Sequence, residues 1–146
     1  MRLKEFYLEY TVLLNHFQSF SLLLARIALA YGFYQPAVLK WSNLDATASW
    51  FASIGIPLPY FATLLSASFE IVGVVLLALG LFTRFISLPL MIIMLIAIFV
   101  VHLPNGFSAG INGFEIPLYY LLFLGLFLTR GAGRFSIDYL MFKGDK

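Results

Sequence analysis

Cysteine is absent from the chain of 146 residues. The chain by itself therefore forms no disulfide, thiol relay or thiolate-held iron–sulfur cluster. Charged residues are also scarce, at 11%, whereas a soluble domain has about 25%. Because 62% of the residues are hydrophobic, the composition predicts an integral membrane protein, and the length predicts one domain over residues 1–146.

Signals for nucleic-acid binding and for secretion are also missing. The net charge of +2 is small and no basic patch with interleaved aromatic residues occurs, so a nucleic-acid partner is not expected. Glu5 and Glu9 interrupt the apolar N-terminal residues, so a cleavable signal peptide is not expected. Apolar residues at helical spacing instead predict an amphipathic helix over about 3–18 that lies on the membrane surface. A frayed tail remains the alternative.

A transmembrane helix needs roughly 20 apolar residues. Stretches near that length lie at about 20–40, 60–82, 85–103 and 114–130. Thr83 and Arg84 form so short a link that the second and third helices must be antiparallel neighbours. The fourth stretch is short, so Glu115 is expected at the edge of the hydrocarbon. The sequence thus predicts an all-α protein, a four-helix transmembrane bundle preceded by the surface helix.

Basic residues flanking the spans predict the orientation, because Lys and Arg concentrate on the cytoplasmic side. One side carries Arg2, Lys4, Arg84, Arg130, Arg134, Lys143 and Lys146, and the other carries Lys40. Both termini are therefore predicted to face the cytoplasm. The outer side would hold a short helix with Trp50 and Phe51 that ends at Gly55, and a glycine-rich loop over 104–114.

Two charged residues, Arg26 and Glu70, stand inside apolar spans, where each costs roughly 2.5–3.5 kcal/mol. Small residues such as Ala30 and Gly73 share their helix faces, so both charges are predicted to point into the bundle. The first hypothesis is an Arg26–Glu70 ion pair, with the long arginine side chain bridging the difference in depth. Such a pair either serves a substrate or only determines the helix register.

A second polar group is predicted near the outer face. Lys40 and Trp41 end the first span, and His102 ends the third. Glu115 opens the fourth, with Tyr119 one turn further on. A histidine beside a carboxylate and an ammonium suits proton uptake or release by a bound ligand. Taken singly, Lys40 and Trp41 are instead typical of interfacial anchors.

Haem and metal sites are not indicated. His16 and His102 are predicted near opposite membrane faces, so they cannot be the two axial ligands of one haem within a monomer. One histidine with one glutamate is also a poor metal signature. No metal is therefore expected, and no cofactor motif is evident in the chain.

Six segments carry a more specific signal. They are LLLARIALAYGF around Arg26, FASIGIPLP at 51–59, LGLFTR at 79–84, VHLPNGF at 101–107, NGFEIP at 112–117 and GAGRFSIDYL at 131–140. Together they resemble the DoxX family of small membrane proteins. The resemblance implies a four-helix bundle in a bacterial inner membrane, and members are commonly described as oxidoreductases without one agreed reaction. The positions that fit the family pattern are Arg26, Lys40, Glu70, His102, Asn105, Gly106 and Glu115.

The predicted function is a quinone- or quinol-linked oxidoreductase component that exchanges electrons with a partner protein. His102 and Glu115 would be the catalytic residues that handle protons. Ligand contacts are expected from Arg26, Tyr34, Lys40, Glu70, Asn105 and Tyr119. Two other classes stay open: a non-catalytic scaffold or assembly subunit for redox proteins, and a small proton-coupled transporter gated by Glu70. The oligomeric state stays open as well.

Overall fold

The computed structural model describes residues 2–143, and Lys146, counted above for the orientation, lies outside them. Within the described residues the chain is helical, without strands, which confirms the all-α prediction. The α-helices are α1 (Arg2–Asn15), α2 (Gln18–Ser42), α3 (Leu44–Ser53), α4 (Pro59–Leu79), α5 (Thr83–Ile96), α6 (Glu115–Arg130) and α7 (Ile137–Phe142). A π-helical turn, η1 (Ala97–His102), and two 3₁₀ turns, η2 (Leu103–Asn105) and η3 (Ala109–Ile111), complete the fold.

In the part of the chain that the structure describes, three helical segments are long and apolar enough to cross a membrane: Gln18–Ser42, Pro59–Leu79 and Thr83–Asn105. The last of these runs from α5 through η1 and η2 without a break. These segments cover the first three predicted spans to within a few residues. The helix α6 covers the fourth, but its 16 residues are fewer than a typical span needs.

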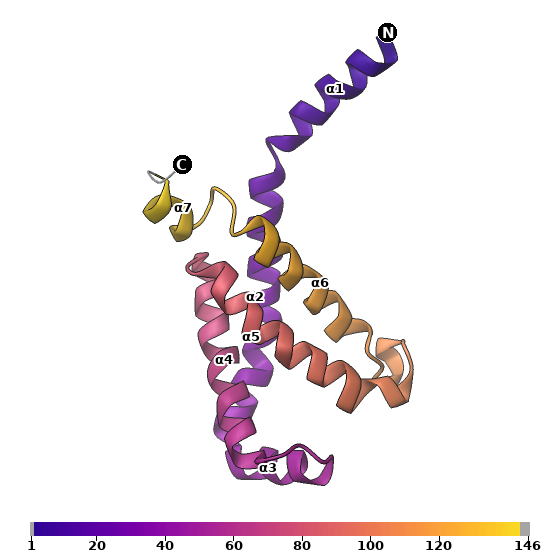
Figure 1. Cartoon of the computed structure of the whole chain (residues 1–146), viewed down its shortest axis with the longest axis vertical. Coiled ribbons are helices and arrows are strands. Elements are labelled where there is room, and N and C mark those ends of the chain that lie inside the picture. Colours follow the sequence, from indigo (N-terminus) through magenta and orange to yellow (C-terminus); the bar gives the residue numbers. More distant parts are fainter. Residues whose placement is uncertain (1, 144–146) are drawn as a thin grey trace.

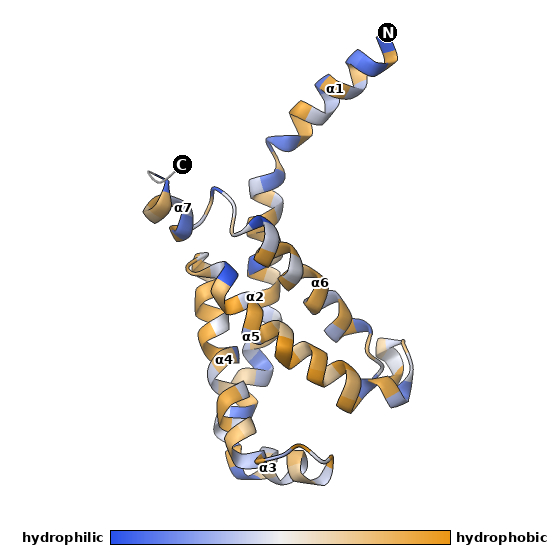
Figure 2. Cartoon of the chain, in the orientation of Figure 1, coloured by the Kyte–Doolittle hydropathy of each residue, from blue (hydrophilic) through white to orange (hydrophobic). Residues whose placement is uncertain are grey.

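The long helices pack in pairs. The α2 helix lies along α4, α5 lies along α6, and α4 contacts α5 (Figure 1). The buried core between them is made of large apolar side chains, among them Leu29, Phe33, Leu77, Leu90, Leu124 and Phe127. Many other large apolar side chains are exposed. Most of the ribbon of these helices has the colour of hydrophobic residues (Figure 2). Such a surface is suited to lipid contact, because lipid tails are as apolar as leucine.

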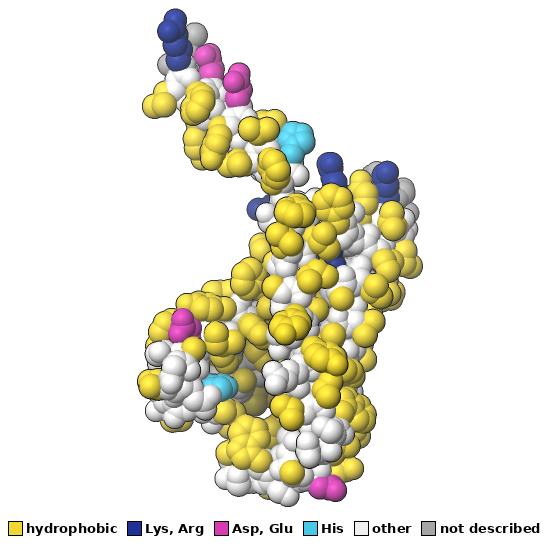
Figure 3. Space-filling model, turned by 180° about the vertical axis from the view of Figure 1, so that it is seen from behind, with side chains coloured by type: hydrophobic (Ala, Val, Ile, Leu, Met, Phe, Trp, Pro, Cys, Tyr) yellow, Lys and Arg dark blue, Asp and Glu magenta, His cyan; other side chains and the backbone are white. Residues whose placement is uncertain are grey.

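The two ends of the molecule differ. At one end lie both termini and the turn between α4 and α5 (Figure 1). At the other end, α3 packs under α4, while α5 and α6 diverge from α4 towards the loop over 103–114 (Figure 1). The space-filling view shows the molecule hollowed between α3 and this loop (Figure 3). The candidate site lies in that hollow.

The N-terminal helix α1 projects from the rest of the molecule (Figure 1). A turn at His16 and Phe17 separates it from α2, and none of its residues is buried. Its exposed apolar side chains include Leu3, Phe6 and Tyr10. A helix is therefore present where the sequence predicts one, and its placement on a membrane surface stays a prediction.

Candidate functional site

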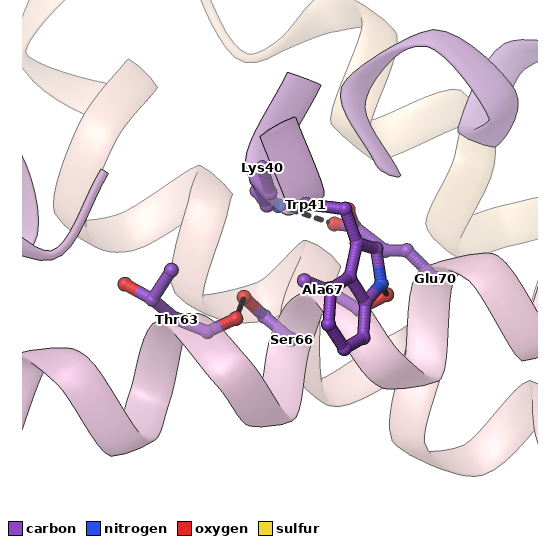
Figure 4. A network of polar contacts seen from close by, with 6 residues as sticks. All are labelled: Lys40, Trp41, Thr63, Ser66, Ala67 and Glu70. Atoms are coloured by element: carbon purple, nitrogen blue, oxygen red, sulfur yellow. Dashed lines mark hydrogen bonds and ion pairs between the residues drawn. The ribbon is translucent and has the colours of Figure 1, made fainter. Parts of the chain in front are cut away.

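An ion pair between α2 and α4 lies at the centre of the candidate site (Figure 4). Lys40 Nζ donates to Glu70 Oε1 across 2.5 Å. Only 2% of the Glu70 side chain and 19% of the Lys40 side chain are exposed. Trp41 lies beside the pair, and its indole Nε1 donates to the Ala67 carbonyl on α4 at 3.1 Å (Figure 4). The last turn of α2 is thereby joined to the middle of α4.

The prediction of an Arg26–Glu70 ion pair is wrong, because Glu70 forms its ion pair with Lys40. The helices α2 and α4 are antiparallel, so Arg26, early in α2, lies beside the end of α4 at Leu77. Leu77 lies seven positions after Glu70, which is about 10 Å along the helix. The arginine side chain does not close this gap, since its guanidinium is engaged by backbone carbonyls.

Arg26 is fully buried, and every nitrogen of its guanidinium donates a hydrogen bond to the backbone. The acceptors are the carbonyls of Leu77 at 2.8 Å, Ala78 at 3.4 Å, Ala132 at 3.1 Å and Phe135 at 2.5 Å. Leu77 and Ala78 belong to the last turn of α4, where carbonyls lack helical partners and the helix dipole favours a cation. Arg26 therefore binds α2, α4 and the segment after α6 together.

The C-terminal GRFSID segment, 133–138, completes this structural network. Asp138 accepts hydrogen bonds from the amides of Phe82 at 2.7 Å and Thr83 at 3.0 Å, where α5 begins. Its own amide donates to the Gly80 carbonyl. Gly80 has φ +67°, and a Cβ there would lie 2.4 Å from Arg26 Nη1, so a larger residue would displace the guanidinium. The resemblance of this segment to the DoxX family is thus explained by its role in holding the fold together.

The Lys40–Glu70 pair borders a cavity of about 440 Å³. Its lining comes from α2, α3, α4, the end of α5, η1, the loop after it and α6. Apolar side chains form most of the wall, including Phe33, Trp50, Phe51, Met94 and Tyr120. Within residues 2–143, Glu70 Oε2 is buried without a hydrogen-bond partner. A carboxylate oxygen bordering an apolar cavity is therefore available to a ligand.

His102 borders the same cavity at the end of the π-helical turn η1. Its Nδ1 lies 2.9 Å from the Asn112 carbonyl, which also accepts from Asn105 Nδ2 at 3.1 Å. Because a carbonyl only accepts, Nδ1 must carry the proton in this contact. In neutral His102, Nε2 then keeps a lone pair, and within residues 2–143 it has no hydrogen-bond partner. π-Helical turns of this kind often occur at functional sites.

Glu115 supports the loop, although the sequence predicted it as a catalytic residue. Its Oε2 accepts from the Ala109 amide at 2.8 Å, and its Oε1 accepts from the Tyr119 hydroxyl at 3.1 Å. The loop is tightly folded at Gly113, where a Cβ would lie 2.4 Å from the Gly106 carbonyl oxygen. Glu115 therefore holds the loop that positions the partner of His102.

The structure brings three of the eight predicted site residues to one cavity: Lys40, Glu70 and His102. The other five do not border it. They are Arg26 in its carbonyl network, Asn105, Glu115 and Tyr119 around the loop, and Tyr34, whose side chain is 54% exposed on α2. The predicted cluster thus divides into side chains at the cavity and side chains that shape its surroundings.

Sequence reasoning missed part of the cavity wall. Tyr120 packs over Gly32, where a Cβ would lie 1.9 Å from the tyrosine hydroxyl oxygen. Gly32 and Pro36 both border the cavity, four residues apart on α2. Proline has no amide hydrogen and so withholds the α-helical bond that the Gly32 carbonyl would otherwise accept. The Gly-x-x-x-Pro pattern inside the first predicted span could have indicated this part of the cavity wall from the sequence.

The chemistry of the site follows from this arrangement. An apolar cavity with a few convergent polar groups is typical of sites for small molecules, which occupy about 300–1,000 Å³. Here the polar groups are one carboxylate, one ammonium and one imidazole. Within residues 2–143, no group of three or more metal-ligating side chains occurs. The site suits a largely apolar molecule that forms a few hydrogen bonds.

Comparisons with known proteins identify one family and several relatives. The DoxX family model matches residues 21–103. "Putative oxidoreductase CatD" of Bacillus subtilis is 31% identical over 125 residues, 85% of this chain and 89% of that protein. An "Uncharacterized protein" of Haemophilus influenzae is 33% identical over 131 residues, 84% of each chain. "Inner membrane protein YphA" of Escherichia coli is 36% identical over 63 residues, 43% of this chain and 45% of that protein. No solved structure matches significantly. The chain is a membrane protein of the DoxX family.

Proposed function

We propose that this protein is the quinone- or quinol-binding membrane component of an oxidoreductase, and that the cavity beside Lys40 and Glu70 holds the ring of the quinone or quinol. The observation that carries the proposal is the buried, unpartnered Oε2 of Glu70 at an apolar cavity of about 440 Å³. An unsatisfied buried acceptor costs about 1–3 kcal/mol, so a cavity that retains one favours a ligand that can pair with it. The name of the Bacillus subtilis relative is consistent with an oxidoreductase role.

The residues present fit such a ligand. The aromatic side chains of Phe33, Phe51 and Tyr120 offer faces and edges to a planar ring. A quinone takes up two electrons and two protons at its ring oxygens when it is reduced. His102 Nε2, which has a free lone pair in the neutral ring, accepts or returns a proton at one side of the cavity, and the Lys40–Glu70 pair exchanges one at the other. Glu115 acts as a positioning residue, since it holds the loop on which Asn112 orients His102.

The electrons come from, or pass to, a redox group of a partner protein. The arrangement in the membrane follows the sequence: α2, α4, the α5–η2 segment and α6 form a four-helix transmembrane bundle. Both termini face the cytoplasm and α1 lies on the membrane surface. This orientation is supported by the basic residues beside the spans and by the position of both chain ends at one end of the molecule (Figure 1). The name of the Escherichia coli relative supports the inner membrane as the location.

A binding measurement on the purified protein tests the proposal. Trp50 borders the cavity, so its fluorescence should be quenched by a short-tailed ubiquinone or menaquinone analogue in mild detergent. His102→Gln should weaken binding about tenfold, because the glutamine amide does not reproduce the positions of both ring nitrogens, one held by Asn112 and the other free for a ligand. His16→Gln is the matched control, since His16 is exposed on the turn before α2 and far from the cavity lining.

Two results would reject the proposal. Wild-type protein that binds none of these quinones, and from which mass spectrometry recovers no bound lipophilic molecule, is not a quinone protein. Equal affinities for wild type and His102→Gln would remove His102 from the site. The first result would favour the scaffold function, in which the buried charges only order the helices.

A further inference from the structure

Hydrogen-bond acceptors at the cavity lack donors from the described part of the protein. Glu70 Oε2 is an acceptor with no partner in the described part of the chain. In neutral His102 the Nε2 atom is also an acceptor, because Nδ1 donates to the Asn112 carbonyl. The Gly32 carbonyl lacks its usual helical donor because residue 36 is proline. Several acceptors therefore border one small apolar space.

Donors border the cavity as well, among them Lys40, the Trp50 indole and the Asn112 amide, but none of them pairs with Glu70 Oε2. Lys40 has three ammonium hydrogens, and one of them is already used by Glu70 Oε1. The Tyr120 hydroxyl can either donate or accept a hydrogen bond. A ligand that only accepts hydrogen bonds could pair with Lys40, but it would leave Glu70 Oε2 unsatisfied. A ligand hydroxyl could donate to Glu70 while its oxygen accepts from Lys40.

We infer that the cavity selects the hydroxyl-bearing, reduced form of an aromatic ring ligand, a quinol or another phenol, over the corresponding quinone. This inference rests on the proposed function and adds which redox form the site prefers. The physical reason is that both oxygens of a quinone are carbonyls, and carbonyls cannot donate. Sites built to hydrogen-bond a hydroxyl reject analogues that lack it, because their own buried polar groups are then left unpaired.

Three ring ligands of similar shape separate these cases: trimethylhydroquinone, trimethylbenzoquinone and the dimethyl ether of the hydroquinone. Each is titrated into the full-length wild-type protein in mild detergent by isothermal calorimetry without oxygen. The hydroquinone is expected to bind at least about tenfold more tightly than either of the others. The dimethyl ether is redox-inert and lacks donors, so its weak binding would exclude electron transfer as the cause.

The variant Glu70→Gln tests the residue responsible. A glutamine amide places its own NH₂ donor where the carboxylate oxygen was, so the preference for the hydroquinone should shrink to about threefold or less. Tyr34→Phe is the control, because it removes an exposed hydroxyl that does not border the cavity. It should leave all three affinities unchanged.

The outcomes separate this inference from the proposed function. Equal wild-type affinities for the hydroquinone and the quinone would overturn the inference while quinone binding stands. Binding of none of the three rings would overturn both. If Glu70→Gln does not fold, the wild-type comparison of the three ligands still decides the inference, since it needs no variant.

Discussion

Arg26 and Lys40 are the two cations of α2, and their surroundings differ in how completely polar groups are paired. The Arg26 guanidinium donates to four backbone carbonyls, from α4 and from the chain after α6. Lys40 meets one carboxylate, Glu70, whose second oxygen has no partner within residues 2–143. The protein supplies an acceptor for every guanidinium nitrogen of Arg26. Within the same residues, it leaves one oxygen of Glu70, the partner of Lys40, without a donor beside a cavity.

The difference shows which buried charge serves the fold and which serves a ligand. A buried charge whose every nitrogen already donates to the protein stabilises the arrangement that provides those acceptors. A buried carboxylate with a free oxygen costs stability in the empty protein. Such a cost is typical of binding sites, which are built for a ligand. The two cations therefore should respond differently to substitution.

The largest expected effect is on the Arg26 side. Arg26→Met would remove the guanidinium donor from four backbone carbonyls, of which that of Leu77 keeps the Gly80 amide as a second donor, and we expect a loss of about 4 kcal/mol in the free energy of unfolding. Arg26→Lys should lose about half as much, because one ammonium cannot reach acceptors spread around a planar guanidinium. The loss is measured as the yield of folded protein in the membrane and as Tm in detergent.

Arg134→Met is the control for this prediction, since Arg134 is exposed on the segment that carries two of the acceptors. Its Tm should match that of the wild type. An Arg26→Met protein that unfolds at the wild-type temperature would show that the carbonyl network adds no stability, and the proposed contrast with Lys40 would fail.

The second effect concerns the ion pair. Lys40→Met leaves the Glu70 carboxylate buried and uncompensated, so a loss of about 3 kcal/mol is expected. Adding Glu70→Leu should restore most of that stability, because a buried pair can often be replaced by apolar side chains. Binding of the ring ligand should be lost in the single variant and should not return in the double variant. Thermal unfolding and calorimetric titration of both variants measure the two quantities. A double variant that still binds the ring ligand would move the site away from the pair.

The helices could be predicted from the sequence because hydropathy and 3.6-residue spacing report burial directly. Lys40, Glu70 and His102 could be predicted for a related reason, since polar residues in apolar spans are rarely tolerated without a role. Their meeting at one cavity depends on the packing of α3 and the loop over 103–114, which no short pattern encodes.

The partners of Arg26 could not be predicted. They are backbone carbonyls of Leu77, Ala78, Ala132 and Phe135, and a carbonyl is present at every residue whatever its side chain. Pairing by side-chain charge alone therefore assigned Arg26 to Glu70. Glu115 begins α6 as the sequence predicts, but its contact with the Ala109 backbone amide could not be predicted for the same reason.

A smaller effect is expected from Asp138, which belongs to the Arg26 side. Its two carboxylate oxygens accept from the amides of Phe82 and Thr83. Asp138→Asn replaces one acceptor with an NH₂ group that faces an amide hydrogen, so a loss of about 1 kcal/mol is expected. Tm measures the loss, and the affinity for the ring ligand should not change. A changed affinity with an unchanged Tm would show that Asp138 serves ligand binding and not the stability of the Arg26 network.

The smallest effect is expected from Glu115, the glutamate on the cavity side that holds the loop without facing the cavity. In Glu115→Gln the amide oxygen can still accept from the Ala109 amide, and the NH₂ group can donate to the Tyr119 oxygen. Both contacts survive, so Tm should stay close to that of the wild type and the affinity for the hydroquinone should change less than about twofold. Glu70→Gln makes the same chemical change and should remove most of the hydroquinone preference. If instead Glu115→Gln abolishes binding while Glu70→Gln leaves it intact, the ligand lies against the loop and the cavity beside Lys40 is not its site.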